Sequence, residues 1–304
     1  MPLWALIALS AGTLQTARNA LARSLAFHLS PALNTWARFA FNLPYSTPLV
    51  LLLHVLHGPA VLPGAFLLGC LATAVAQLLG NVALIAAFRR ATFAQSIVLH
   101  KLEVAFAALV GAALFGEYPT LVGWLGVAAC TVGVLFINLG RDIGLPRWRR
   151  AFHLDAGALL AIASGLLWVF ASFFLKDANE AFAAANPRIG TDRFEAAAYT
   201  LFHTTWMEVA ILTVWLLVAE RGALRAVPRH WRRMALLGAS GFGGSLCWYW
   251  AYSLTLVAYV KAVGQIEAVM AVVLSLVVWH EREVLRQIPG VAMVLVGIAL
   301  VLLG

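Results

Sequence analysis

The sequence is poor in charged residues, and this excludes an ordinary soluble protein. Lys, Arg, Asp and Glu together make up 11% of the 304 residues, whereas hydrophobic residues make up 62%. A typical soluble domain carries about 25% charged residues. The chain is therefore predicted to lie in a lipid bilayer, with no room for a large domain outside the membrane.

Cysteine is also scarce. Cys70, Cys130 and Cys247 lie far apart and inside apolar runs, so they form neither a disulfide framework nor a metal-ligand cluster. No metal site and no cofactor are predicted. The net charge of +8 does not indicate nucleic acid binding, because the arginines gather in short breaks between apolar runs, such as 146–150 and 229–233.

Motifs of the common enzyme classes are missing as well. The chain contains no HExxH, no GxSxG and no P-loop lysine motif, and the glycine-rich stretch 238–245 lies inside an apolar run rather than between a strand and a helix. His100 and Glu103 are of the types that perform acid–base chemistry, but a proton relay uses the same types. The protein is predicted not to be an enzyme.

Apolar runs of about 20 residues, enough to cross the hydrocarbon core, follow one another along the chain. Helices are expected, because a helix satisfies its own backbone groups in lipid. The first run continues into Gln15, Arg18 and Asn19 rather than into a cleavage site, which indicates a retained span. The break 177–194 is predicted to be a mobile segment outside the membrane. The predicted spans are 3–22, 34–56, 64–87, 92–115, 121–139, 156–176, 195–219, 233–253, 256–279 and 285–303.

The two halves of the chain resemble each other. The segment 101–140 aligns with 265–304 without a gap, and 11 of the 40 positions are identical. We call this the repeat alignment. The chain is therefore predicted to contain a first five-helix repeat over 1–140, a basic loop over 141–155 and a second five-helix repeat over 156–304. The aligned pairs include Glu103 with Glu267, Glu117 with Glu281, Gly126 with Gly290 and Gly133 with Gly297.

An odd number of spans in each repeat has a topological consequence. The second repeat must enter the membrane from the opposite side, so the two halves are inverted. Inverted repeats are typical of secondary transporters, which hold their cargo near the bilayer midplane between the two bundles. The predicted fold is an all-α integral membrane protein with ten transmembrane helices in two inverted five-helix repeats.

Each half closes on the same short motif, a glutamate followed after eight residues by a glycine and after six more by a second glycine. With ten spans in two halves, this motif resembles the EamA-type drug/metabolite transporter superfamily. The resemblance covers essentially the whole chain and implies export or exchange of small molecules, from amino acids to nucleotide-sugars. Family members often carry a proline in the middle of the fourth and ninth spans. This chain has LEVAF and IEAVM there, so the resemblance carries over no helix break.

Two carboxylates near the bilayer centre are the leading candidates for a site. An ionisable group there costs at least ~2.5–3.5 kcal/mol on insertion scales. Glu103 and Glu267 occupy equivalent positions in the two repeats, so this cost occurs twice, which suggests a function. We expect both to line a cavity; the structural alternative is a buried pair that fixes helix register. On a helix Lys101 lies about 160° from Glu103, so Glu103 is expected to find its partner on a facing helix. The candidate partners are Arg18, Asn19, Arg38, Gln77, Asn81, His203 and Glu208.

Further residues complete the predicted substrate or ion site. Trp248 and Tyr252 share a helix face and either wall a cavity or anchor the chain at the interface. His100, about 60° from Glu103, is expected to share a proton with it. Glu117 and Glu281, at span ends, are expected to be structural. The predicted site comprises Glu103, Glu267, Lys101, His100, Lys261, Gln265, Arg38, Trp248 and Tyr252.

Both signs of charge in this set favour a small zwitterionic or polar metabolite, such as an amino acid, over a cationic drug. Proton coupling through titration of Glu103 and Glu267 is predicted, and a facilitator with permanently paired carboxylates is the competing view. A receptor or assembly scaffold is the alternative of another class. The expected partners are a small molecule, protons and the lipid bilayer, without nucleic acid, and a homodimer is an open alternative.

The distribution of basic residues predicts the orientation. The odd-numbered breaks between spans hold 14 arginines, and the even-numbered breaks hold three Lys or Arg residues. Cytoplasmic loops carry the excess of basic residues. The odd breaks are therefore predicted to be cytoplasmic, and both termini are predicted to lie outside. The expected location is the cell membrane, as a multi-pass protein, and we expect it to be a bacterial inner membrane.

Overall fold

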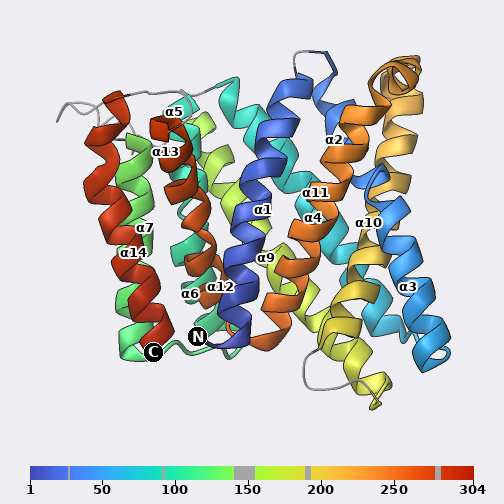
Figure 1. Cartoon of the computed structure of the whole chain (residues 1–304), viewed down its shortest axis with the longest axis horizontal. Coiled ribbons are helices and arrows are strands. Elements are labelled where there is room, and N and C mark those ends of the chain that lie inside the picture. Colours follow the sequence, from blue (N-terminus) through green and yellow to red (C-terminus); the bar gives the residue numbers. More distant parts are fainter. Residues whose placement is uncertain (27, 91–92, 140–154, 189–192, 278–281) are drawn as a thin grey trace. The chain divides into compact units, whose positions relative to one another are not determined.

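The structure, a computed structural model, describes residues 1–304 except 27, 91–92, 140–154, 189–192 and 278–281 (Figure 1). Every regular element in the described part is a helix, so the prediction of an all-α protein is confirmed. Among the described residues, seven helical segments are long and apolar enough to cross a membrane. The arrangement as ten spans in two inverted repeats stays a prediction.

The helices follow the apolar runs of the sequence, because each run satisfies its backbone groups internally. In chain order they are α1 (Leu3–Ala26), α2 (Pro31–Ala40), α3 (Leu43–His57), α4 (Gly64–Phe88), α5 (Phe93–His100), α6 (Glu103–Leu114), α7 (Leu121–Leu139), α9 (Ala156–Ala185), α10 (Phe194–Ala219), α11 (Val227–Leu254), α12 (Val257–Gly264), α13 (Ile266–Val277) and α14 (Ile288–Leu303), with short 3₁₀ helices at Ala223–Ala226 and Arg282–Gln287.

Two of the predicted spans are interrupted near their middles. The span 92–115 is divided between α5 and α6, and the span 256–279 between α12 and α13. At the first break the amide of Leu102 donates to the carbonyl of Leu99, and at the second the amide of Gln265 donates to that of Ala262, three residues back instead of four. Neither break contains a proline. The two breaks lie at positions that the repeat alignment superimposes.

The chain divides into two compact units. Unit 1 comprises residues 1–9, 76–173 and 255–304, and unit 2 comprises residues 10–75 and 174–254. Each unit thus draws on both halves of the sequence. This division follows packing, so it does not test the predicted division into repeats.

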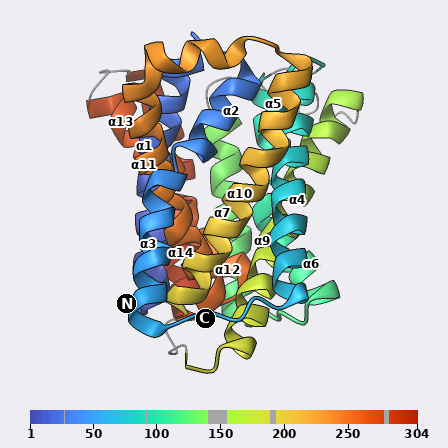
Figure 2. The same cartoon turned by 90° about the vertical axis from the view of Figure 1, so that its right-hand side faces the viewer.

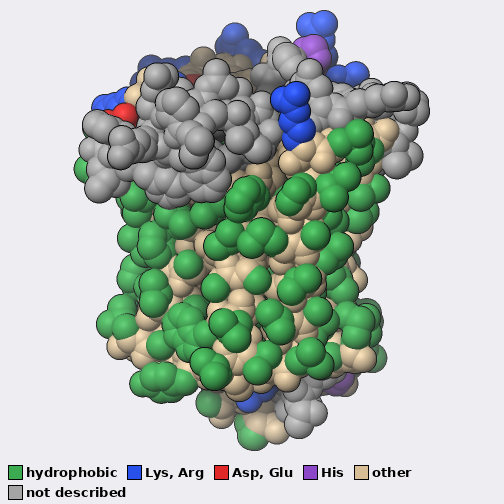
Figure 3. Space-filling view, turned by 90° about the vertical axis from the view of Figure 1, so that its left-hand side faces the viewer, with side chains coloured by type: hydrophobic (Ala, Val, Ile, Leu, Met, Phe, Trp, Pro, Cys, Tyr) green, Lys and Arg blue, Asp and Glu red, His purple; other side chains and the backbone are tan. Residues whose placement is uncertain are grey.

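In unit 1, α7 and α14 pack against each other along their length (Figure 1). The glycines of the repeated motif allow this close approach. A Cβ atom on Gly126 would lie 2.8 Å from the carbonyl oxygen of Gly297, and one on Gly133 would lie 2.8 Å from that of Gly290. Hydrophobic side chains cover the middle of the face in Figure 3, as expected of a surface toward lipid, and Lys and Arg side chains lie toward its ends.

In unit 2, α10 packs against α2, α3 and α11 (Figure 2). A buried cluster around Phe66, Phe182 and Tyr199 joins α4, α9 and α10. The indole Nε1 of Trp36 on α2 donates to the hydroxyl of Thr213 on α10 at 2.8 Å. These contacts fix α2 and α3 beside α10.

The break predicted at 177–194 is wrong over its first half. Helix α9 continues to Ala185, because small and apolar residues extend its helical pattern beyond the charged residues. Asn186 then accepts the amide N–H of Val61 at 2.8 Å and donates to the carbonyl of Val61 at 2.9 Å. These bonds tie the end of α9 to the connection before α4, so this part is not a loose segment. Residues 189–192 lie outside the described residues.

Candidate functional site

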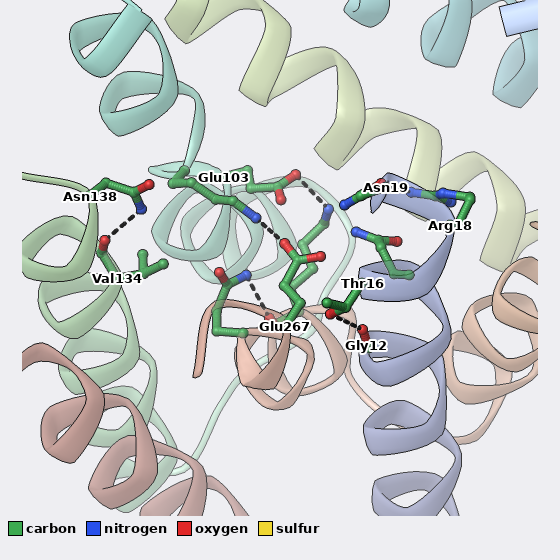
Figure 4. Close-up of polar contacts among 12 residues, drawn as sticks. Gly12, Thr16, Arg18, Asn19, Glu103, Val134, Asn138 and Glu267 are labelled. Atoms are coloured by element: carbon green, nitrogen blue, oxygen red, sulfur yellow. Dashed lines mark hydrogen bonds and ion pairs between the residues drawn. The ribbon is translucent and has the colours of Figure 1, made fainter. Parts of the chain in front are cut away.

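Two crossed ion pairs lie at the helix breaks of unit 1 (Figure 4). Lys101 binds Glu267, and Nζ of Lys261 lies 3.0 Å from Oε2 of Glu103. The side chains of Lys261 and Glu103 are only 6% and 13% exposed. Each pair therefore connects one broken span to the other. We call these four residues the crossed-pair cluster.

The ends of the broken helices explain where these charges lie. Glu103 is the first residue of α6 and Glu267 lies in the first turn of α13, while Lys261 lies in the last turn of α12. A carboxylate at a helix N-terminus and an ammonium at a C-terminus are each stabilised by the helix dipole, by about 0.3–1 kcal/mol. The breaks thus supply oriented helix ends for both signs of charge.

Gln265 occupies the break between α12 and α13. Its side chain is buried, and its Nε2 donates to the carbonyl of Lys261 at 3.2 Å. Its Oε1 is buried and accepts no hydrogen bond within the described part of the chain. A buried acceptor without a donor costs free energy, so this oxygen is available to the N–H group of a ligand.

His100 is held by α9 rather than by Glu103. Its Nδ1 lies 3.1 Å from the hydroxyl of Ser164, which donates to the carbonyl of Gly80 at 2.8 Å. A Cβ atom on Gly165 would lie 2.8 Å from the carbonyl oxygen of His100, so this glycine allows α9 to approach the end of α5. The predicted shared proton between His100 and Glu103 has no hydrogen bond to support it.

The partner of Glu103 was only partly predictable. The expectation that Lys101 does not pair with Glu103 on its own helix is confirmed, because Lys101 reaches Glu267. The expected partners of Glu103 were wrong, because the contact comes from Lys261, which was not among them. The repeat alignment, continued toward the N-terminus without a gap, places Lys261 opposite Ile97, so the repeat contained no signal for this pair.

The other predicted site residues belong to unit 2. Trp248 and Tyr252 lie on one face of α11, as predicted, with their ring centroids 5.7 Å apart. Nε1 of Trp248 donates to the side-chain oxygen of Gln15 at 2.9 Å. The guanidinium of Arg38 lies over the ring of Phe39, 4.9 Å from its centroid. The part of these residues in binding stays a prediction.

Glu117 has a structural contact that the sequence did not reveal. Its Oε2 accepts the amide N–H of Val257, the first residue of α12, at 2.7 Å. A carboxylate in this position caps the N-terminus of the helix. The expected structural role of Glu117 is thus supported by a specific bond, whereas Glu281 lies outside the described residues.

A pocket of about 500 Å³ also occurs in unit 2, at the beginning of α11. It contains none of the predicted site residues. Within the described residues no group of three or more His, Cys, Asp or Glu is arranged to hold a metal ion. The pocket is lined by His28, Pro228, Arg229, His230, Trp231, Arg232 and Arg233.

Comparison with known proteins places the chain in a family. Residues 155–303 match the sequence model of the EamA-like transporter family, whereas no curated protein matches significantly. Among solved structures 27 chains match, and one of them, titled "Crystal structure of protein", aligns over 99% of this chain and 97% of its own length with a TM-score of 0.68 and 18% identity. At this identity the likeness shows a shared fold alone. The chain is a multi-pass membrane protein and belongs to the EamA-like transporter family, within the drug/metabolite transporter superfamily.

Proposed function

We propose that the protein is a secondary transporter that exports or exchanges a small polar metabolite, with an amino acid as the leading class. The observation that carries this proposal is the crossed-pair cluster at the two helix breaks. Secondary transporters typically form their cargo sites from discontinuous helices, whose ends face the charged groups of the cargo. In this chain both breaks carry charged residues of opposite sign.

The charges of the cluster favour a zwitterionic cargo. When a buried ion pair opens, each partner needs a new counter-charge, because an unpaired buried charge costs several kcal/mol. An amino acid supplies a carboxylate for the lysines, Lys101 and Lys261, and an ammonium for the glutamates, Glu103 and Glu267. A cationic drug would satisfy the glutamates and leave the lysines unpaired, so it is the second candidate.

The arrangement of the breaks supports two inverted repeats of five spans as the framework of this transporter. Lys101 and Gln265 occupy equivalent positions in the repeat alignment, and each lies where its span is interrupted. In such a framework the two broken spans exchange roles between the conformation open to the cytoplasm and the one open to the outside. We place the protein in the cell membrane, with its odd-numbered breaks in the cytoplasm.

A ligand screen on the purified protein tests the proposal. Amino acids, nucleosides, polyamines and quaternary amines are compared by thermal shift, since a ligand at 100 times its Kd stabilises by about 2.7 kcal/mol. The double variant Glu103→Gln, Lys261→Met removes one buried pair without leaving a lone charge, and we expect it to lose the amino acid shift. The double variant Arg188→Gln, Glu195→Gln alters an ion pair of unit 2 and should keep the shift.

Two outcomes contradict the proposal. If only quaternary amines raise the melting temperature of the unaltered protein, the cationic cargo replaces the amino acid. If a ligand that binds is not carried into vesicles containing this protein alone, the chain is a receptor or scaffold instead of a transporter.

A further inference from the structure

The middle of α10, in unit 2, carries a buried acidic side chain with one carboxylate oxygen that is unbonded within the described residues. Glu208 is 1% exposed, and its Oε1 accepts no hydrogen bond from the described residues. It also forms no ion pair with any of them. The carboxylates of the crossed-pair cluster differ in this respect, because each binds a lysine.

The ionisable groups around Glu208 leave it without a close counter-charge. Arg38, on α2, is the charged group that acts on Glu208 electrostatically, but the two form no ion pair, and Nε of Arg38 is itself buried without a hydrogen bond in the described part of the chain. On α11, Tyr249 acts on Arg38 rather than on Glu208. Further titratable groups on the neighbouring helices are Tyr45, His54 and His57 on α3, of which His57 binds Glu195, Cys70 on α4, and Lys176, Asp177 and Glu180 on α9.

The free energy of burial favours a neutral carboxyl in such a place. Burying an ionised carboxylate without a partner costs far more than burying the protonated form. A charge on Glu208 therefore requires water, cargo or the guanidinium of Arg38 to approach it. Uptake and release of one proton would then accompany the opening and closing of the packing around α10.

Two buried threonines extend from Glu208 along one face of α10. Thr204 and Thr200 precede it by four and eight residues and are fully buried. The hydroxyl of Thr200 makes no hydrogen bond within the described residues, and that of Thr204 makes none there except with the thiol of Cys70. Helical threonines usually bond back to the carbonyl four residues earlier, as Thr213 does to Val209 at 2.6 Å.

The two threonine hydroxyls lie between Glu208 and the first turn of α10. From Glu208 to Thr200 the distance along the helix axis is about 12 Å, toward the end of α10 that is predicted to face the outside. A hydroxyl both donates and accepts hydrogen bonds. Two hydroxyls at this spacing can therefore line a proton path once water enters the packing around α10. If these two positions served the fold alone, nonpolar side chains would cost less free energy to bury than threonine hydroxyls.

We propose that Glu208 holds the exchangeable proton of this transporter, and that Thr204 and Thr200 line its route to the outer end of α10. The proposal rests on the proposed transport function and assigns proton coupling to unit 2 rather than to Glu103. The crossed-pair cluster then binds cargo, with each carboxylate paired either with its lysine or with the ammonium group of the cargo.

Chemical labelling of the unaltered protein tests the proton site without any cargo. Dicyclohexylcarbodiimide reacts with protonated carboxyls in apolar surroundings, and mass spectrometry identifies the modified residue. We expect labelling of Glu208 that decreases as the pH is raised, with Glu103 and Glu267 unlabelled. No label on Glu208, or equal labelling of Glu103, overturns the proposal. Because no substitution is made, a folding defect cannot produce either result.

Transport measurements then test the coupling. In proteoliposomes supplied with the amino acid that gives the largest thermal shift, Glu208→Gln should abolish accumulation driven by a pH gradient and keep exchange at equal pH. Glu103→Gln should reduce both, because it alters the cargo site. Glu195→Gln, on the same helix and already ion-paired, is the matched control. Accumulation by Glu208→Gln at the level of the unaltered protein contradicts the proposal, whereas failure of all transport with intact labelling contradicts the proposed function alone.

Discussion

Removal of Lys261 should destabilise the protein more than any surface substitution, because it takes the ion-paired ammonium group away from the buried carboxylate of Glu103. At the observed 3.0 Å two unit charges attract each other by about 5–6 kcal/mol for an effective dielectric constant of about 20. The exposed fractions of 6% and 13% leave little water to screen this attraction. We expect Lys261→Met to lower the free energy of unfolding by about 3–5 kcal/mol, as is usual when one partner of a buried pair is removed.

A double-mutant cycle measures how much of this loss belongs to the pair. The variants Lys261→Met, Glu103→Gln and their combination are unfolded reversibly by sodium dodecyl sulfate in mixed micelles. The double variant should be more stable than Lys261→Met, because it contains no lone buried charge, and the coupling energy should reach about 2–3 kcal/mol. Single losses that add within about 0.5 kcal/mol would refute the reasoning.

The pair of Arg188 and Glu195, in which the Glu195 side chain is buried and only Arg188 reaches solvent, provides the control cycle. Its atoms lie 3.6 Å apart, and the Arg188 side chain is 37% exposed. Solvent screens the charge of Arg188, so we expect this pair to couple less strongly than the buried one, closer to the roughly 0–1 kcal/mol of exposed pairs. A coupling energy here as large as that of the buried pair would show that burial does not determine the strength of the crossed pairs.

Three further predictions concern packing and helix ends. Gly133→Ala should lower the free energy of unfolding by about 1–3 kcal/mol, because the new Cβ atom would lie 2.7 Å from the amide nitrogen of Val294, whereas Gly64→Ala, with open space around it, should have little effect in the same titration. Glu117→Leu should remove the cap of α12 at a cost of about 1 kcal/mol, seen as faster hydrogen exchange in the first turn of α12; unchanged exchange would exclude a capping role. Asn186→Ala should leave the backbone groups of Val61 unpaired and cost about 1–3 kcal/mol, and protection of the Val61 amide equal to that in the parent would contradict this.

The helices and the principal charged residues were predictable from the sequence, and the helix breaks were not. Long apolar runs require helices in lipid whatever the side chains are, and charges inside such runs are rare enough to identify Glu103 and Glu267. The breaks depend on a few backbone hydrogen bonds around Lys101 and Gln265. Without a proline these bonds have no sequence signature, so the spans were predicted as continuous.

The pairing of charges was unpredictable for a different reason. Helix periodicity shows which residues share a face of one helix, and it correctly separated Lys101 from Glu103. It does not show which helix lies opposite. The contact of Lys261 with Glu103 depends on the packing of α12 against α6, and the unbonded oxygen of Glu208 becomes visible only when its surroundings are known.

The repeat alignment relates the two carboxylates of the site to each other, but it does not relate the two lysines that bind them. Glu103 and Glu267 are equivalent in the repeat alignment, whereas Lys101 is opposite Gln265 and Lys261 is opposite Ile97. Lys101 lies in the short connection between two helices, and Lys261 lies within the last turn of α12. A connection changes its backbone angles more easily than a helical turn, because fewer backbone hydrogen bonds oppose the change. The pair of Lys101 and Glu267 is therefore expected to open at lower cost, and under the proposed transport function a cargo carboxylate should bind Lys101 before Lys261.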